Sequence, residues 1–362
     1  MIFATDKIYK MAQFHSVTVS NIVKETSDAV SVSFDIPESL KADFVFIPGQ
    51  YLTLKMMISG EECRRSYSIC SSKNEPLTVA VKKVPNGKMS SLINDNLNVG
   101  DSIEIMPPQG NFLLNPSEKN TRKFVGFAAG SGITPIMSMI KQMVISEPNS
   151  QFLLFYSNKT EDEVIFKNQF DQFSDSSLDV KFIYTRQKAE SALLEGRIDQ
   201  QKATDLIQSN MSWVNSDAFY LCGPEEMIFS TKNALKSFGI LEDKIKFELF
   251  TSPVILAEKQ EPVEVDEGFD GEAMITVICD DEEVEFALDR DGDTILDAAM
   301  DEDVDVPFSC KGAVCCTCKA KVVEGKVSMD ANYALSEEEV ADGFVLACQA
   351  HPASAKVIID FD

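Results

Sequence analysis

The chain has 362 residues, a length that predicts two or three folded domains. Hydrophobic residues make up 44% of it and charged residues 25%, a composition typical of folded proteins that excludes disorder throughout. Asp and Glu outnumber Lys and Arg by 58 to 33, which gives a net charge of −25. A chain this acidic repels phosphate backbones, so we expect no nucleic-acid partner.

Residues 1–13 match no regular pattern and are interpreted as an N-terminal tail. In residues 14–117, short runs rich in β-branched residues, such as HSVTVSNIV and LTVAVKKV, are separated by Pro, Gly, Asn and Asp. This spacing predicts an antiparallel β-barrel. In residues 118–250, apolar strands alternate with helical patterns such as ITPIMSMIKQMV, FKNQFDQF and EEMIFSTKNALKSF. That alternation predicts an α/β domain with a parallel sheet.

A linker and an acidic module are predicted for the rest of the chain. Residues 251–271 combine prolines, glycines and acids without a regular period and are interpreted as a linker. Residues 272–362 return to strands around one short helix, TILDAAMDE, which indicates an α+β domain. They hold 22 acidic and 6 basic residues, so over half of the net charge lies in a quarter of the chain. This asymmetry supports a separate module.

Two further features predict the compartment. No stretch of about 18 consecutive apolar residues is present, so we expect no membrane-spanning segment and no membrane partner. The first residues have no long apolar core behind a basic start and do not form a signal peptide pattern. Nine cysteines without an export signal then predict reduced thiols in the cytoplasm, where cysteine clusters are more often metal or redox sites than disulfides.

The strongest motif is a set of four cysteines, Cys310, Cys315, Cys318 and Cys348. Their spacing, C-x4-C-x2-C and then 29 residues to the fourth, is that of plant-type [2Fe–2S] ligation. A binuclear cluster needs four thiolates because each tetrahedral iron takes two ligands besides the bridging sulfides. The alternatives are a four-cysteine zinc site, which usually shows two separate C-x2–4-C pairs, and unrelated buried cysteines. Cys316, between two of the ligands, is interpreted as packing, with a redox role as the alternative.

Residues 272–362 resemble the plant-type ferredoxin module. The resemblance rests on SCKGAVCCTCKAKVVEG, which is similar to that family's cluster loop, and on LACQAHP, which is similar to its fourth-ligand segment. It implies a β-grasp fold that holds a [2Fe–2S] cluster through the four cysteines.

The predicted barrel carries two motifs that can bind a flavin. In Arg65-Ser66-Tyr67-Ser68, an arginine can hold a diphosphate, a tyrosine ring can cover an isoalloxazine and a serine hydroxyl can contact a flavin nitrogen. In Gly87-Lys88-Met89-Ser90, the glycine permits a turn close to phosphate and the serine can open a helix that faces it. The first motif alone is more typical of a polar strand end around a buried tyrosine.

The turn from Gly130 to Pro135 (GSGITP) follows an apolar strand and precedes a helix, as a phosphate-binding loop requires. It departs from the dinucleotide fingerprint, because Pro135 stands where a third small residue is expected. No acidic residue follows at the distance expected for a ribose contact either. As an isolated motif it therefore leaves a simple strand–turn–helix open.

Taken in order, the RSYS, Gly87–Ser90 and GSGITP motifs, followed by Cys222-Gly223-Pro224, resemble the ferredoxin–NADP reductase superfamily over residues 14–250. The resemblance implies a Greek-key flavin barrel joined to a nicotinamide-binding α/β domain. It implies that Arg65, Ser66, Tyr67, Ser68, Gly87, Lys88, Met89 and Ser90 hold FAD, and that Gly130, Gly132, Thr134, Pro135, Cys222, Gly223 and Pro224 frame the nucleotide. Glu248 and Phe250 would lie near the flavin ring, and Ser68, Cys222 and Glu248 would be the catalytic residues.

Arg186 stands where NADP-using relatives in this superfamily place an arginine for the 2′-phosphate. A guanidinium there favours NADPH over NADH. A solvated arginine at a strand end is the alternative. His15 and His351, the two histidines of the chain, lie in unrelated segments, which argues against a histidine metal site or a histidine-based triad.

The combined domain order resembles the reductase components of multicomponent oxygenases. The FHSVTVSNIVKETSDAVSVSFDIP start, the RRSYSICSS segment and the Cys315-Cys316 doublet are similar to the reductase subunits of phenylacetyl-CoA epoxygenase complexes, which serve phenylacetate degradation. The resemblance implies electron transfer from NADPH through FAD and a [2Fe–2S] cluster to a multisubunit di-iron oxygenase partner. A flavin is needed because hydride carries two electrons and the cluster accepts one. The alternatives are a reductase for another hydroxylase or Rieske oxygenase, and a non-catalytic redox sensor or assembly protein. FMN in place of FAD also stays open.

We expect the linker to act as a flexible coil that reaches roughly 25 Å. The ferredoxin-like module could then dock near the flavin and afterwards turn to an acceptor. Its acidic surface is predicted to meet a basic patch on the partner, because charge steering speeds transient encounters. The alternative is that these acids only keep the module in solution.

Overall fold

The computed structural model describes residues 13–173, 177–251, 269, 271–280 and 282–362. The chain divides into two compact units, of which one spans His15–Pro253 and the other contains the C-terminal residues to Asp362. Most of the predicted tail (1–13) and linker (251–271) lies outside the described residues. No helix in the described ranges is long and apolar enough to cross a membrane.

The first domain is a six-stranded antiparallel sheet with strand order β4-β3-β6-β1-β2-β5. An isolated antiparallel bridge between Ile69 and Val79 brings the chain after β4 onto β5, which draws the two edges of the sheet together. Alternate residues of the strands point inward, so valine, leucine and isoleucine form the core. The elements are β1 (His15–Thr26), β2 (Ala29–Asp35), β3 (Tyr51–Ile58), β4 (Glu61–Ser68), β5 (Leu77–Lys82), α1 (Lys88–Asp95) and β6 (Ser102–Ile105), with a 3-10 turn at Glu38–Leu40.

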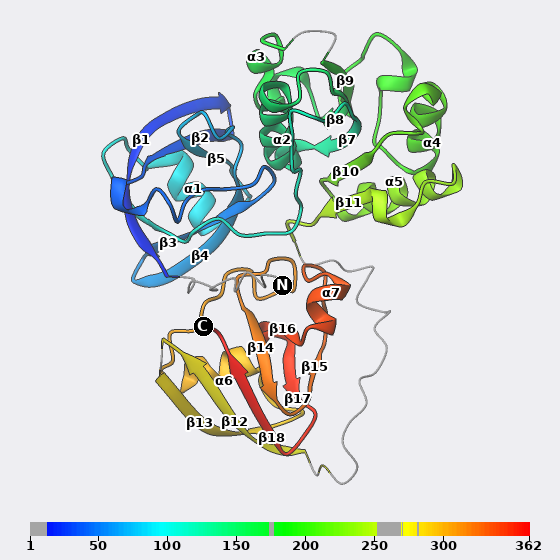
Figure 1. Cartoon of the computed structure of the whole chain (residues 1–362). Helices are drawn as coiled ribbons and strands as arrows, with labels where there is room; N and C mark the ends of the chain where they lie inside the picture. Colours follow the sequence, from blue (N-terminus) through cyan, green and yellow to red (C-terminus); the bar gives the residue numbers. More distant parts are fainter. Residues whose placement is uncertain (1–12, 174–176, 252–268, 270, 281) are drawn as a thin grey trace. The chain divides into compact units, whose positions relative to one another are not determined.

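The second domain has five parallel strands in the order β11-β10-β7-β8-β9. The central strands are buried on both faces because helices cover them (Figure 1), which explains their nearly continuous apolar sequence. The strands are β7 (Lys123–Ala129), β8 (Gln151–Asn158), β9 (Leu178–Tyr184), β10 (Ala218–Cys222) and β11 (Ile245–Glu248). The helices are α2 (Ile133–Ser146), α3 (Lys167–Phe170), α4 (Gln200–Gln208) and α5 (Glu225–Ser237), so the predicted FKNQFDQF helix is reduced to four residues.

Helix α2 joins the two domains of this unit through a polar seam. The Ser138 hydroxyl donates to Ser71 O at 2.7 Å, and Gln142 Oε1 accepts from the Lys73 N–H at 2.8 Å. Lys141 pairs with Glu75 at 3.1 Å. These contacts recur along one face of the helix, as residues three or four positions apart must. Because the GSGITP turn opens α2, the seam fixes that turn relative to the barrel.

The C-terminal unit has a mixed sheet with strand order β13-β12-β18-β14-β16, in which β12 and β18 run parallel. Its elements are β12 (Glu272–Cys279), β13 (Glu282–Asp289), α6 (Ile295–Asp301), β14 (Lys319–Glu324), β15 (Val327–Met329), α7 (Glu337–Ala341), β16 (Phe344–Leu346), β17 (Ala350–Pro352) and β18 (Lys356–Asp360). The expectation of one helix was wrong: Ser336 and Glu339 form a capping box that starts α7. The three-domain fold class is confirmed (Figure 1).

Candidate functional site

The cysteine loop brings its four predicted ligands together. Cys310, Cys315 and Cys318 lie on the irregular segment before β14, and Cys348 lies on the 3-10 turn after β16. The Cys315 and Cys310 sulfurs are 3.1 Å apart, and the Gly312 N–H donates to the Cys310 sulfur at 3.3 Å. Lys311 and Ala313 have positive φ angles of 48° and 63°, which turn the loop backbone around the sulfurs.

The electrostatics of the four thiols fit a metal-bound centre. Hydrogen bonds from Cys315 and Cys348 hold the pKa of Cys310 well below its usual range, to about 2. The same contact with Cys310, followed by burial, raises the pKa of Cys315. Contacts with Cys310 and Cys318 raise the pKa of Cys348. Four neighbouring sulfur donors and a backbone N–H contact are the donor set that a [2Fe–2S] cluster requires.

The other cysteines have separate contacts. The Cys316 sulfur donates to Ala334 O at 3.4 Å, a packing contact. Cys70 donates to Thr78 O, and burial raises the pKa of its thiol to about 12. All nine cysteines of the chain are free thiols.

The flavin motif lies along β4, and its side chains become less exposed from Arg65 to Ser68. Arg65 and Ser66 are accessible, and Arg65 also donates to Arg64 O. Tyr67 is half-buried, and loss of hydration raises the pKa of its hydroxyl. Ser68, at the end of the strand, is buried. The exposed Arg65 guanidinium is therefore available to an anionic ligand, on the same face of the strand as the Tyr67 ring.

The Gly87–Ser90 turn begins helix α1. The Ser90 hydroxyl accepts from the Val84 N–H at 3.1 Å, Met89 packs into the barrel core, and Lys88 pairs with Glu61. A Cβ on Gly87 would lie 2.5 Å from the Ser90 oxygen, so glycine is required for this close turn. The part of this motif that remains available to bind a phosphate is therefore the set of backbone N–H groups at the start of α1.

Ser68, Cys222 and Glu248, the three predicted catalytic residues, meet where the barrel contacts the parallel sheet. The Ser68 hydroxyl donates to Glu248 Oε2 at 3.2 Å, and Cys222 is the register partner of Glu248 on β10 and β11. Burial raises the pKa of Glu248 to about 8, while the hydrogen bond from Ser68 acts in the opposite direction. Burial, and then the nearby Glu248, raise the pKa of Cys222 well above its usual range. Near neutral pH, Glu248 is therefore largely protonated.

The GSGITP turn is packed against the end of β10. A Cβ on Gly132 would lie 2.1 Å from Cys222 O, and one on Gly223 would lie 2.7 Å from the Met227 side chain. Gly130 has a φ of 54°, a backbone conformation that glycine adopts without strain. The Thr134 hydroxyl donates to Ser131 O at 3.0 Å and so stabilises the turn itself. Pro135 lies in the first helical turn, where its missing N–H costs nothing.

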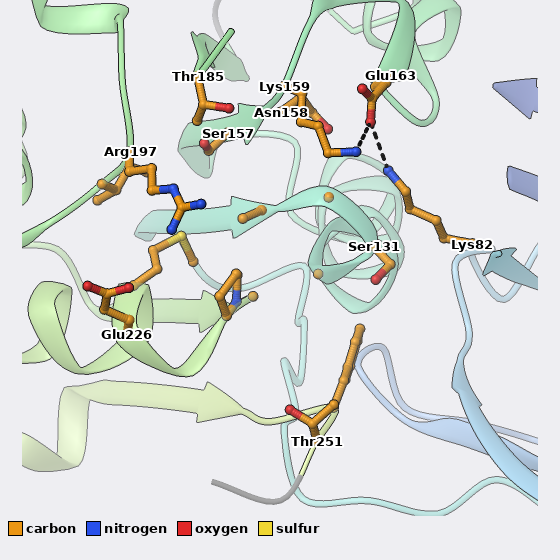
Figure 2. Close-up of a pocket in the computed structure, with 18 of the residues that line it drawn as sticks. Lys82, Ser131, Ser157, Asn158, Lys159, Glu163, Thr185, Arg197, Glu226 and Thr251 are labelled. Carbon is orange, nitrogen blue, oxygen red and sulfur yellow. Dashed lines mark hydrogen bonds and ion pairs between the residues drawn. The ribbon is translucent and has the colours of Figure 1, made fainter. Parts of the chain in front are cut away.

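A cleft of about 610 Å³ opens at the carboxyl ends of the parallel strands (Figure 2). This is the edge at which open α/β sheets bind ligands. The predicted residues Gly130, Gly132, Gly223, Pro224 and Phe250 line it, whereas Thr134, Cys222 and Arg186 do not. Its other lining residues are Lys82, Ala129, Ser131, Ser157, Asn158, Lys159, Glu163, Thr185, Arg197, Ile198, Asp199, Glu226, Met227 and Thr251.

The sequence prediction missed the charged groups of the cleft. Glu163 pairs with Lys159 at 3.0 Å and with Lys82, on barrel strand β5, at 3.4 Å (Figure 2). Arg197 makes no ion pair with any residue that the structure describes. The Arg186 N–H donates to Lys159 O at 2.8 Å, but the Arg186 side chain is not part of the cleft lining. Lys82 and Lys159 lie at strand ends, a position that could have marked them in the sequence as candidate cleft residues. Arg197 has no such position, so the sequence offered no signal for it.

Three family models match the chain in order. The oxidoreductase FAD-binding domain matches residues 16–113, the oxidoreductase NAD-binding domain matches residues 127–233, and the 2Fe-2S iron-sulfur cluster binding domain matches residues 277–353. Together they cover both compact units.

Two relatives and one solved structure resemble the whole chain. A subunit of 1,2-phenylacetyl-CoA epoxidase from Escherichia coli (strain K12) is 38% identical, over 97% of this chain and 99% of the relative. The ferredoxin reductase component of 3-ketosteroid-9-alpha-monooxygenase from Rhodococcus rhodochrous is 31% identical, over 95% and 96%. Phthalate dioxygenase reductase is 22% identical, covers 96% of this chain and 98% of its own, and has a TM-score of 0.56, which shows a shared fold.

Proposed function

We propose that this chain, which belongs to the family of oxidoreductases that join FAD-binding, NAD-binding and 2Fe–2S domains, is the NADPH-dependent reductase of a multisubunit di-iron oxygenase. That oxygenase would act on phenylacetyl-CoA, because the family includes the matched 1,2-phenylacetyl-CoA epoxidase subunit. The observation that carries the proposal is the 38% identity to that subunit over nearly the whole length of both chains. The oxygenase partner, and not this chain, would bind the acyl-CoA.

The residues support a division of labour among three sites. When bound, a flavin accepts hydride and passes electrons on singly, and a [2Fe–2S] cluster carries one electron at a time. Cys310, Cys315, Cys318 and Cys348 would hold the cluster. Arg65 and the N-terminus of α1 would hold the FAD phosphates, beside the Tyr67 ring. The glycine-rich turn and the cleft would hold the nicotinamide nucleotide.

Glu248 would hold a proton at the edge of the flavin site. With a pKa of about 8, its carboxyl carries that proton at neutral pH, and the Ser68 hydroxyl donates to Oε2. A neutral side chain there adds no negative charge where hydride is transferred, and it can exchange a proton with its hydroxyl neighbour. The pair thus supplies a polar but uncharged contact where the barrel meets the parallel sheet.

The preference for NADPH over NADH is supported by the cations of the cleft. Arg197 has a guanidinium without an ion pair in the described ranges, and Lys159, about half exposed, lines another part of the same cleft. An unpaired guanidinium favours a phosphate dianion through a charge-assisted hydrogen bond. We therefore assign the 2′-phosphate contact to Arg197, with Arg186, the residue predicted from the sequence, as the alternative.

The cytoplasm is proposed as the compartment because none of the nine cysteines forms a disulfide, as is usual under reducing conditions. An acidic surface on the 2Fe–2S module is proposed to steer it towards a basic patch of the oxygenase. The alternative, that the acids only keep the module in solution, predicts a partner-reduction rate that does not change with salt concentration.

The test uses protein loaded with its cofactors and the purified oxygenase subunits of phenylacetyl-CoA epoxidase. We expect NADPH-driven reduction of cytochrome c and, with those subunits, epoxide formation from phenylacetyl-CoA. Cytochrome c reduction without epoxide would favour another oxygenase, for which the 31% identity to the ketosteroid monooxygenase component is the supporting observation. No reduction of any acceptor would leave a non-catalytic redox protein. Chromatography of the extracted flavin separates FAD from FMN.

A further inference from the structure

Asn158 is the last residue of β8 and lines the nucleotide cleft (Figure 2). Its side chain is 5% exposed, so it is almost completely removed from water. Its backbone carbonyl is already hydrogen-bonded, because Asn158 O accepts from the Thr185 N–H at 2.9 Å. The side-chain amide is the part of this residue that is left to face the cleft.

Neither polar atom of that amide has a hydrogen-bond partner among the described residues. The nearby Tyr156 hydroxyl donates to Gly130 O at 3.1 Å, and Asn158 is close enough to oppose the rise in the Tyr156 pKa that burial causes, but the two side chains do not reach normal hydrogen-bond geometry. Native proteins rarely leave a buried donor and acceptor unpaired, because each loses its hydration without compensation. Such an amide therefore indicates a ligand.

The chemistry of the amide limits which part of a nucleotide it can bind. It offers both an NH2 donor group and a carbonyl acceptor, whereas a phosphate offers acceptors only. A ribose offers both, since each hydroxyl donates and accepts. The end of the second parallel strand is also where dinucleotide-binding domains place an acidic residue on the ribose. This chain lacks that acid, and Asn158 occupies the corresponding strand end, about 25 residues after the glycine-rich turn.

We propose that the Asn158 side chain binds the ribose of the adenosine half of the nucleotide, with Nδ2 donating to a ribose oxygen and Oδ1 accepting from a ribose hydroxyl. This inference rests on the proposed function of the cleft. It also explains why an amide stands here: a carboxylate would repel the 2′-phosphate of NADPH, and a neutral side chain does not. Asn158 is thus a specificity-determining residue that acts together with Arg197.

The decisive variant is Asn158→Leu, which has nearly the same shape but no polar atom. In flavin-loaded protein without nucleotide, it should raise the temperature at which flavin is released by about 2 °C or more, because it removes an unpaired polar group. In the same protein, the Kd for NADP⁺ and for 2′,5′-ADP should rise about 5-fold or more, because the ribose contact is lost. If Asn158 had a purely structural role, the leucine substitution would instead lower both the thermal stability and the yield of folded protein.

Asn158→Asp tests the charge argument and covers the case in which the leucine variant does not fold. It should raise the KM for NADPH more than the KM for NADH, because the carboxylate repels the extra phosphate. Asn210→Leu is the matched control: Asn210 lies outside the cleft and donates to Leu206 O at 2.8 Å, so this change should lower the melting temperature and leave nucleotide affinity unchanged.

Several results would overturn the assignment. A lower melting temperature of Asn158→Leu with unchanged affinity would show a structural role. Weaker binding of NADP⁺ with unchanged binding of 2′,5′-ADP would place the contact on the nicotinamide half. Failure of the wild-type protein to bind either nucleotide would overturn the proposed function as well. That last result is distinguishable from the first two, because in them the wild-type protein does bind.

Discussion

The cysteine loop and the nucleotide cleft differ in how their residues are arranged along the chain. Three of the four thiols lie within nine residues, from Cys310 to Cys318, and the fourth follows on a nearby turn. The cleft instead collects residues from the ends of several strands and from barrel strand β5. A ligand held by covalent metal–sulfur bonds dictates residue type and spacing, whereas a ligand held by hydrogen bonds and charge can be bound by many residue types.

This difference predicts that a single substitution in the loop can abolish cluster binding, whereas nucleotide binding in the cleft is shared among many residues. The largest effect is expected for Cys348→Ser, which removes one of four ligands. We expect loss of the iron–sulfur absorption bands and a fall of at least about 100-fold in cytochrome c reduction, with ferricyanide reduction by the flavin largely intact. Iron and sulfide analysis with both acceptor assays measures this.

Cys316→Ser provides the matched control, since Cys316 makes a packing contact with Ala334. It should retain the cluster bands and both activities. If ferricyanide reduction disappears together with the cluster in Cys348→Ser, the two units are not separable as proposed.

The cleft does contain a position, Gly132, at which no larger side chain fits. Gly132→Ala would place a Cβ 2.1 Å from Cys222 O, which is backbone and cannot move aside. We expect a loss of stability of about 1–3 kcal/mol and a Kd for NADP⁺ raised by roughly 10-fold or more. Thermal unfolding and nucleotide titration measure it, with Ile145→Ala, on the exposed side of the same helix, as the control. Wild-type affinity in Gly132→Ala would contradict the close packing of the turn.

Glu248→Gln is expected to reduce the rate of flavin reduction by about 10-fold and to remove any inflection of that rate near pH 8. The stability effect has a defined sign. Because the folded-state pKa is about 8 and the ordinary value 4.5, the folded protein binds a proton that the unfolded chain has lost between these values. Stability therefore falls as pH rises through this window, and it should fall less in the glutamine variant. Equal pH dependence in both proteins would remove the argument for a protonated Glu248.

The smallest effects are expected for single cations of the cleft. Arg197→Ala should raise the KM for NADPH about 10-fold and change the KM for NADH little, since the lost hydrogen bond is charge-assisted. Arg186→Ala, whose side chain does not line the cleft, should change both values less. The reverse order of the two variants would return the 2′-phosphate contact to Arg186.

Some of the fold follows directly from local sequence patterns. Alternating strands predicted the barrel, and the apolar strands with amphipathic helices predicted the parallel sheet, because these periodicities reflect which side chains are buried. Helix α7 was missed because it is five residues long and starts at a capping box instead of an apolar repeat. The short α3 shows the opposite error, since FKNQFDQF has helical spacing but only Lys167–Phe170 form a helix.

For the candidate sites, the sequence by itself predicted four cysteines as ligands and the glycine-rich turn, because both are local motifs whose chemistry depends on residue type and spacing. Only the tertiary structure placed Lys82 and Glu163 together, put Arg197 in the cleft and left the Asn158 amide without a partner among the described residues. The Ser68–Glu248 contact joins residues 180 positions apart. The packing of the antiparallel barrel against the parallel-sheet domain brings such distant residues together, and no local pattern records which of them will meet.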